Sequence, residues 1–282
     1  MPESTPSIEA ACSPGFADRP RTILVKYGGN AMLDPRLVDA VLRRLVGAQR
    51  SGMRLVLVHG GGPYIAQRLE QQGLESRFIE GQRVTGPEEM AVVSMVLCGE
   101  LNGRIVSDLH RLGAAAVGLC GRDGNTCIAE PLLNPPGLGQ VGEVGRMDPA
   151  LVKLLLDNGY LPVLAPVSPG PDGSDYNINA DMFAGSLAAA LGADEYLVLT
   201  DVDGLYRNWP DRDSLVEGIN TDELELLLAE GISGGMIPKL RGCLAALRGG
   251  ASSARIINGT RPEALQAALD GAATGTVIRE KQ

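Results

Sequence analysis

The sequence predicts an α/β protein built on a mostly parallel sheet, and two observations lead to this expectation. Short continuous apolar runs, typical of strands covered on both faces, alternate with amphipathic helical segments from residue 22 onward. Several of these runs end in glycine-rich loops. Because ligands bind at the carboxyl ends of parallel strands, we expect a small-molecule site where those loops meet.

Length, charge and cysteine content narrow the class of protein. At 282 residues, the chain can form one compact domain with two lobes. The formal net charge of -9 argues against sequence-independent binding to nucleic acid or an anionic membrane, since both depend on clustered basic residues. The five cysteines are odd in number and lack Cys-x-x-Cys spacing, so neither a disulfide framework nor a zinc site is indicated. Without a signal peptide or an 18-residue apolar run, we expect a cytoplasmic protein.

The first βαβ unit is the clearest part of the pattern. A strand over residues 22–26 is followed by Asp34-Pro35, an N-cap and first-turn proline, and by helical spacing over residues 37–46. A second strand over 55–58 runs into the glycine cluster 59–63. The preceding residues 1–20 contain four prolines among small and polar residues and are expected to form a disordered tail.

Gly60, Gly61 and Gly62 lead into the N-terminus of a predicted helix. Free backbone N–H groups and the helix dipole make such a place a ready anion site. A tight turn between strand and helix would give the same pattern. The spacing matches neither the Gly-x-Gly-x-x-Gly dinucleotide fingerprint nor a Walker A loop.

Residues 76–84 predict a small hairpin or lid that carries Arg83. An arginine there could grip a carboxylate with two hydrogen bonds, although the chain has many arginines. Thr85 and Glu88 have the spacing of a capping box and predict the start of a long helix that reaches Ile105.

The remaining elements are predicted from the same signals. They are a strand over 114–120, a short hairpin within 125–147, a helix from Asp148-Pro149 to 156, a strand over 161–167, a helix over 182–191, a strand over 195–200, a helix over 221–228, and a last strand and helix within 255–269 that close the sheet. The loop 169–173 is expected to join two lobes.

Lysine is rare in this chain, which raises the interest of two of its lysines. Of 25 basic residues only four are lysine, and both Lys26 and Lys239 lie in glycine-rich surroundings. A compact, rotatable ammonium is favoured over a planar guanidinium at some catalytic sites. Lys26 alone would equally fit a lysine whose stem is buried at a strand end. Lys239 lies at a predicted helix start, where the macrodipole disfavours a cation, so we expect it to have an anionic partner.

Polar residues cluster at two further strand ends. Asn177 and Asp181 precede the helix over 182–191, although helix capping alone would explain them. Asp201 and Asp203 follow the strand over 195–200, and either could be a turn residue.

Taken in order, six segments resemble those of the amino acid kinase family. They are Lys26–Met32, His59–Pro63, Gly81–Thr85, Asn177–Asp181, Leu199–Val202 and Gly235–Lys239. The resemblance covers roughly residues 22–280. It implies a three-layer α/β/α sandwich around a mostly parallel central sheet, the carbamate kinase-like fold. A single domain over 21–282 would comprise an N-lobe to about residue 170, for substrate binding and dimerisation, and a C-lobe from about residue 171, for ATP.

The resemblance is strongest to family members that phosphorylate N-acetyl-L-glutamate in arginine biosynthesis. It implies that ATP, as its Mg²⁺ complex, converts the side-chain carboxylate to N-acetyl-L-glutamyl 5-phosphate, with release of ADP. The phosphates and water would hold most of the magnesium, so no protein metal ligand is expected. No tightly bound prosthetic group is implied.

The family motifs also imply roles for individual residues. The catalytic group would be Lys26, Lys239 and Asp181, with the carboxylate orienting the two lysines. The substrate would be bound by Gly61, Gly62, Arg83 and Asn177. The nucleotide would be bound by Gly28, Gly29, Asp201, Val202, Asp203, Gly204, Leu205, Tyr206, Gly231, Ile232 and Ser233.

Two departures from the family pattern concern assembly and regulation. Arginine-inhibited members resemble one another in an amphipathic N-terminal helix that links dimers into hexamers, whereas the tail here is broken by prolines. Those members also carry a histidine and a glutamate near the last helix, where this chain has Glu263 and Ala268. We therefore expect a homodimer with weak or absent arginine sensitivity.

Three other functions remain as alternatives. A related kinase acts on aminoadipate or glutamate held on a small acidic carrier protein, but such an enzyme should lack Asn177. A non-catalytic nucleotide or amino acid sensor would have no need of Lys26, Asp181 and Lys239. An NAD-dependent dehydrogenase would fit the α/β pattern but not the missing glycine fingerprint.

Overall fold

A computed structural model describes residues 19–232 and 234–281, and the backbone alone at Asn30. The expected tail therefore lies almost wholly outside the described residues. The central sheet has eight strands in the order β14-β16-β15-β11-β1-β2-β8-β5. All neighbouring pairs in it are parallel except β15 and β16. The strands are β1 (Thr22–Tyr27), β2 (Arg54–His59), β5 (Ala116–Cys120), β8 (Leu161–Ala165), β11 (Glu195–Thr200), β14 (Gly218–Asn220), β15 (Ala254–Asn258) and β16 (Thr276–Arg279).

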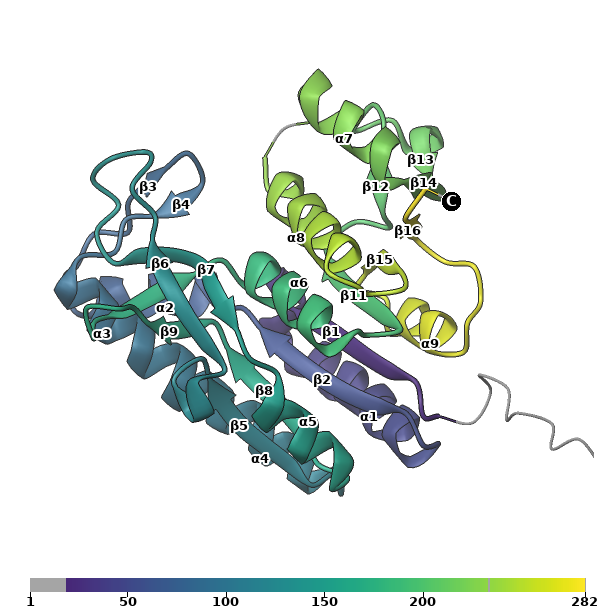
Figure 1. Ribbon diagram of the computed structural model, residues 1–282, viewed down its shortest axis with the longest axis horizontal. Coiled ribbons are helices and arrows are strands. Elements are labelled where there is room, and N and C mark those ends of the chain that lie inside the picture. The colour runs from purple at the N-terminus through teal and green to yellow at the C-terminus, as the bar shows by residue number, and fades with distance from the viewer. Residues whose placement is uncertain (1–18, 233, 282) are drawn as a thin grey trace, which may run out of the picture.

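Helices cover both faces of this sheet, which confirms the predicted three-layer α/β/α sandwich (Figure 1). One face is covered by α1 (Pro35–Arg50), α2 (Gly62–Gln71), α9 (Pro262–Leu269) and the long helix described below. The other is covered by α5 (Ala150–Asp157), α6 (Ala180–Leu191), α7 (Thr221–Glu230) and α8 (Met236–Arg248). Side chains alternate along β1, so Ile23 and Val25 join the first core and Leu24 the second.

The predicted long helix is present but begins differently. It runs through α3 (Pro87–Ser94), a π-helical segment η2 (Met95–Leu101) and α4 (Asn102–Arg111). The predicted capping box is wrong, because Gly86 is the N-cap and no side chain caps this end. Thr85 instead pairs with Gly139 in a parallel β-bridge. The stretch from α3 to α4 is long and apolar enough to span a membrane by composition, yet its buried residues contribute to the first core.

A smaller sheet packs beside the second core. It has the order β6-β7-β10-β9, formed by β6 (Cys127–Pro131), β7 (Val141–Met147), β9 (Val167–Pro169) and β10 (Asp175–Ile178). The predicted hairpin within 125–147 is confirmed as β6 and β7. The loop 169–173 does not join two lobes as expected, because it is the turn between antiparallel strands β9 and β10 of one sheet.

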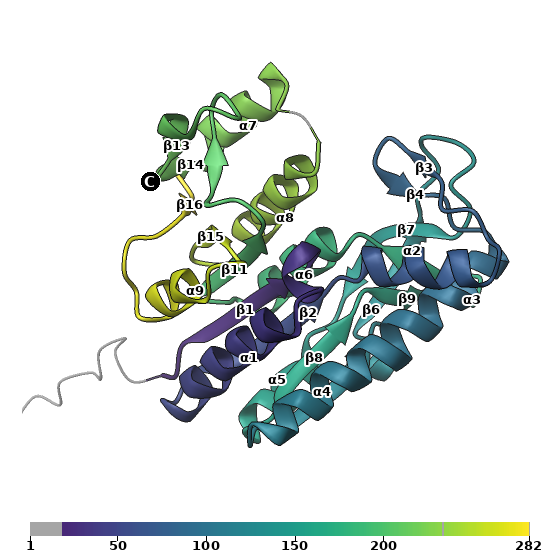
Figure 2. The ribbon, with the colours of Figure 1, turned by 180° about the vertical axis from the view of Figure 1, so that it is seen from behind.

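Two short hairpins and one sheet edge complete the fold. The predicted hairpin near residue 80 is confirmed as β3 (Phe78–Ile79) and β4 (Gln82–Arg83), while β12 (Leu205–Tyr206) pairs with β13 (Leu215–Val216). The expectation that β15 closes the sheet is wrong, since β16 and β14 extend it. In Figure 2, seen from behind, the β3–β4 hairpin and α7 both lie along the upper side of the view, well separated from each other.

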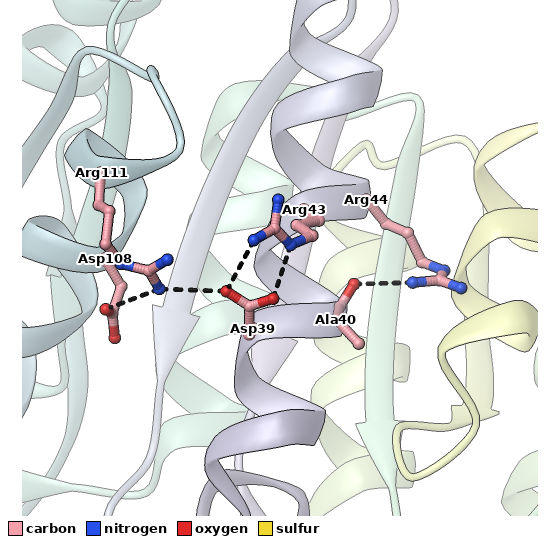
Figure 3. A network of polar contacts seen from close by, with 6 residues as sticks. All are labelled: Asp39, Ala40, Arg43, Arg44, Asp108 and Arg111. Carbon is pink, nitrogen blue, oxygen red and sulfur yellow. Dashed lines mark hydrogen bonds and ion pairs between the residues drawn. The ribbon is translucent and has the colours of Figure 1, made fainter.

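Helices α1 and α4 are linked on the surface by one carboxylate. Asp39 accepts hydrogen bonds from Arg43, one turn along α1, and from Arg111 at the end of α4 (Figure 3). Arg111 also bonds Asp108. These hydrogen bonds, first from Arg43 and then from Arg111, lower the pKa of Asp39. Because the network is exposed, it contributes little to stability.

Candidate active site

Two lysines form ion pairs with the two different oxygens of one carboxylate. Lys26 Nζ is 3.1 Å from Asp181 Oδ1, and Lys239 Nζ is 3.5 Å from Asp181 Oδ2. Lys239 also donates to the Gly235 carbonyl at 3.2 Å. The sequence prediction that Lys239 needs an anionic partner is thereby confirmed.

All three charged groups are withdrawn from solvent. The side chains of Lys26 and Asp181 are 7% and 6% exposed, and that of Lys239 is 16% exposed. Burial lowers the pKa of Lys239, while the charge of Asp181 opposes that shift and the charge of Lys26 adds to it. Two cations share the Asp181 carboxylate, and the charge of Asp201 also acts on Lys239. Paired ammonium groups of this kind suit a negatively charged ligand.

The local fold explains why these residues meet. Lys26 follows Leu24 by two residues in β1, so it points to the same face of the sheet, where α6 packs. Asn179 caps α6 by accepting from the backbone N–H of Asp181 at 2.9 Å, which places Asp181 in the first helical turn. Lys239 occupies the first turns of α8, the helix in closest contact with α6.

Glycine loops after β1 and β2 converge beside the lysines. A Cβ on Gly28 would lie 2.9 Å from Lys26 Nζ, so glycine leaves room for the ammonium. Gly29 has a φ of +75°, and a Cβ there would lie 3.1 Å from an Asp201 carboxylate oxygen. Gly60 approaches Gly28 and the start of α6. The predicted loops therefore meet at the carboxyl ends of three neighbouring strands.

A cavity of about 580 Å³ adjoins Lys239, and its size suits a nucleotide. Its lining includes most of the predicted nucleotide-binding residues: Asp201, Val202, Leu205, Tyr206, Gly231 and Ile232. Sequence reasoning missed Arg207, Asn208, Trp209 and Met236, which also line it. The sequence feature that could have pointed to this lining is Trp209, the single tryptophan of the chain. In the structure Trp209 is 59% exposed and packs edge-on against Tyr206, with ring centroids 5.2 Å apart.

Two of the residues predicted to bind the nucleotide, Asp203 and Gly204, are held by other contacts. Asp203 accepts from Asn258 Nδ2 at 2.8 Å and pairs with Arg261 at 3.2 Å. Gly204 packs against Thr276, where a Cβ would come within 2.5 Å of the hydroxyl oxygen. Neither residue lines the cavity beside Lys239. Ser233 lies outside the described residues.

Arg83 is held beside the second glycine loop. Its guanidinium donates to the Gly62 carbonyl at 3.0 Å and to Ser76 Oγ, and stacks over Phe78 at 4.7 Å. Phe78 faces Arg83 across the β3–β4 hairpin. Burial lowers the pKa of Arg83, but the guanidinium stays protonated because its ordinary pKa is so high.

Asn177 and His59 complete this side of the site. Asn177 Nδ2 donates to Thr85 Oγ1 at 3.3 Å. His59 is fully buried next to the glycine loop, bonded to Gly60 and to Asn102 Nδ2, and burial lowers its pKa to about 4. Asn102 Nδ2 can only donate, so His59 Nε2 accepts and the ring is neutral.

Another cavity, of about 590 Å³, lies at the opposite ends of the strands and is lined by residues such as Arg50, Arg54 and Asp157. It is remote from the lysines and the glycine loops. We therefore place the chemistry at the Lys26–Asp181–Lys239 cluster.

The fold and the paired lysines define a kinase that acts on small molecules. The chain belongs to the amino acid kinase family, whose sequence model matches residues 21–258. It is 45% identical to acetylglutamate kinase of Pelotomaculum thermopropionicum over 256 residues, 87% of each chain. It is 46% identical over 248 residues to chloroplastic acetylglutamate kinase of Arabidopsis thaliana, covering 88% of this chain and 72% of that protein.

Solved structures share the fold at lower identity. Carbamate kinase from Giardia lamblia bound to AMP-PNP superposes with a TM-score of 0.70 at 21% identity, covering 93% of this chain and 99% of that one. N-acetylglutamate synthase from Neisseria gonorrhoeae gives a TM-score of 0.81 at 24% identity. The match covers 94% of this chain but only 60% of the synthase.

Proposed function

We propose that the chain is an acetylglutamate kinase, which phosphorylates the side-chain carboxylate of N-acetyl-L-glutamate at the expense of ATP, an early step of arginine biosynthesis. The observation that carries this proposal is the placement of Lys26 and Lys239 on one buried carboxylate. Relatives named acetylglutamate kinase, 43–46% identical over most of the chain, support the choice of substrate.

The reaction needs positioning and charge stabilisation more than covalent catalysis. A substrate carboxylate oxygen forms a bond to the γ-phosphorus as the bond from that phosphorus to the bridging oxygen breaks, and ADP leaves. Lys26 and Lys239 flank the migrating group and neutralise its charge, while Asp181 holds both ammonium groups in place.

The other predicted site residues receive roles that match their positions. Backbone N–H groups of Gly61 and Gly62 bind the substrate carboxylate that is phosphorylated, and Arg83 binds its α-carboxylate. Asn177 faces the acetylated amino group. The cavity lined by Tyr206 and Trp209 receives the adenine of ATP, whose phosphates carry Mg²⁺. Asp203 and Gly204 shape the loop around this cavity.

We extend the proposal to organisation and regulation. The N-lobe binds N-acetylglutamate and dimerises, and the C-lobe binds MgATP. The boundary between them lies after β10 rather than near residue 170, because β9 and β10 belong to one sheet. The enzyme is a cytoplasmic homodimer with little response to arginine, because α9 carries Glu263 and Ala268. A hexamer in light scattering, or tight arginine binding in calorimetry, would contradict this part.

Trapping of the acyl phosphate with hydroxylamine tests the activity. N-acetyl-L-glutamate should give hydroxamate in an ATP-dependent reaction, whereas glutamate, aspartate and aminoadipate should give little. If ATP binds but no free amino acid derivative reacts, the substrate assignment is wrong, and a carrier-linked substrate or a sensor role replaces it.

A further inference from the structure

Thr85 lies at the junction between the element that carries Arg83 and the sheet that carries Asn177. It is fully buried two residues after Arg83, and its backbone is fixed on both sides. Its N–H donates to the Leu138 carbonyl at 2.9 Å, and its carbonyl accepts from the Gln140 N–H at 2.6 Å. The backbone therefore holds Thr85 in position without help from its hydroxyl.

The hydroxyl makes a different pair of bonds. Thr85 Oγ1 donates to the Arg83 carbonyl at 2.8 Å and accepts from Asn177 Nδ2 at 3.3 Å. A hydroxyl has one hydrogen, and here it is committed to the Arg83 carbonyl. The oxygen can then only accept, so the Asn177 amide must turn its NH2 group toward Thr85. Asn177 Oδ1 is left as an acceptor on the other side.

We propose that Thr85 is a positioning residue that sets the substrate specificity of the site by fixing the amide orientation of Asn177. This inference rests on the proposed function. An acylated amino group offers a single N–H donor, which the Oδ1 atom of Asn177 accepts. The same hydroxyl ties the backbone of Arg83 to Asn177, so the groups that read the α-carboxylate and the acylamino group of one substrate share a fixed spacing.

Thr85→Val removes the hydroxyl and keeps the shape of the side chain. The Asn177 amide can then rotate, and its acceptor is no longer held in place. The KM for N-acetyl-L-glutamate should rise about tenfold, because one oriented hydrogen bond to the substrate is lost. The KM for ATP should not change, since Thr85 is absent from the cavity lining beside Lys239. Thr85→Ser retains the hydroxyl and should restore specificity.

A substrate analogue separates orientation from general damage. In 2-acetoxyglutarate an ester oxygen replaces the amide N–H. The ester oxygen and Asn177 Oδ1 are both acceptors, so they cannot form a hydrogen bond. The wild-type enzyme should prefer the amide over this ester by about 100-fold in kcat/KM. In Thr85→Val the amide can turn Nδ2 toward the ester, and the preference should fall about tenfold. Thr85→Ala, which also lacks the hydroxyl, serves if the valine variant does not fold.

Thr126 supplies a matched control. It is also fully buried, and its hydroxyl donates to the Asp123 carbonyl at 2.6 Å. Thr126→Val should leave the amide-to-ester preference unchanged. An unchanged preference in Thr85→Val, or in Thr85→Ala if the valine variant does not fold, with activity on N-acetyl-L-glutamate present, would overturn the role of Thr85 and leave the proposed function standing. Absence of activity on N-acetyl-L-glutamate in the wild-type enzyme would overturn the proposed function and this inference with it.

Discussion

Gly185 of α6 and Gly242 of α8 bring the two helices into backbone contact. A Cβ on Gly185 would lie 2.2 Å from the Gly242 carbonyl oxygen, and a Cβ on Gly242 would lie 2.5 Å from the Asp181 carbonyl oxygen. That oxygen also accepts from the hydroxyl of Tyr196 at 3.1 Å. The close crossing sets the distance between Asp181 and Lys239, so the packing of small residues determines the geometry of the charged site.

Gly242→Ala should therefore impair both stability and activity. The new methyl group must push α8 away from Asp181, at a cost of about 1–3 kcal/mol in the free energy of unfolding. We expect a lower Tm and a fall in kcat of at least about tenfold, measured by thermal unfolding and the hydroxamate assay.

Gly47→Ala is the matched control. Gly47 lies in the interior of α1 with no atom near the position of a Cβ, so alanine should stabilise the helix by up to about 1 kcal/mol and leave kcat unchanged. Wild-type kcat in Gly242→Ala would contradict the role assigned to the crossing.

Asp181→Asn should move the alkaline limb of the pH–rate profile. The charge of Asp181 raises the pKa of Lys239 against the lowering effect of burial, so its removal should lower that pKa further. Lys239 would then lose its proton at lower pH, and kcat would decline earlier as pH rises. A profile of kcat from about pH 7 to pH 10 tests this, and a limb that stays in place or moves upward would contradict it.

The stability of the protein should fall in acid because of His59. Its pKa is lowered from 6.5 in the unfolded chain to about 4 in the folded protein, so the unfolded state binds a proton first as the pH falls. Near pH 4.5 the loss should be roughly 2–3 kcal/mol. Urea unfolding across pH 4.5–7 measures it.

His59→Gln keeps an acceptor for Asn102 and removes the titration, so this part of the pH dependence should disappear. The other histidine, His110, donates from Nε2 to the Ala116 carbonyl at 2.9 Å and offers a control at a different site. If His59→Gln keeps the wild-type slope, the buried neutral ring is not the cause.

Trp209 should report nucleotide binding. It is the only tryptophan of the chain and lines the cavity beside Lys239, so its fluorescence has one origin. Addition of MgATP should change the emission in a saturable way, and Trp209→Phe should abolish the signal and raise the KM for ATP several-fold. Unchanged emission at ATP concentrations that saturate turnover would place the adenine elsewhere.

Much of the sheet could be predicted because its strands are local, continuous apolar runs. The β1–α1–β2 unit and the ionic partner of Lys239 followed from the pattern of glycine, proline and helix-cap residues. Strands β14 and β16 could not be predicted, because three or four residues give no clear periodicity and their pairing is non-local.

The same limit explains the error at Thr85. Its spacing to Glu88 fits a capping box, yet its partners Leu138 and Gln140 lie more than fifty residues along the chain and hold it in a β-bridge. Tertiary contacts outweighed a local signal. The place of Trp209 in the lining of the cavity beside Lys239 was missed for a similar reason, since the loop that carries Trp209 shows no strand or helix pattern.

The most direct test of this account is the single-turnover rate of acyl phosphate formation from N-acetyl-L-glutamate and MgATP. In Lys26→Ala and Lys239→Ala the rate should fall about 10²- to 10³-fold, because each variant loses a preorganised positive charge at the migrating phosphoryl group. Lys153→Ala, which alters an exposed lysine of α5, should retain the wild-type rate. Near-normal rates in both active-site variants would contradict the assignment of catalysis to the two lysines on Asp181.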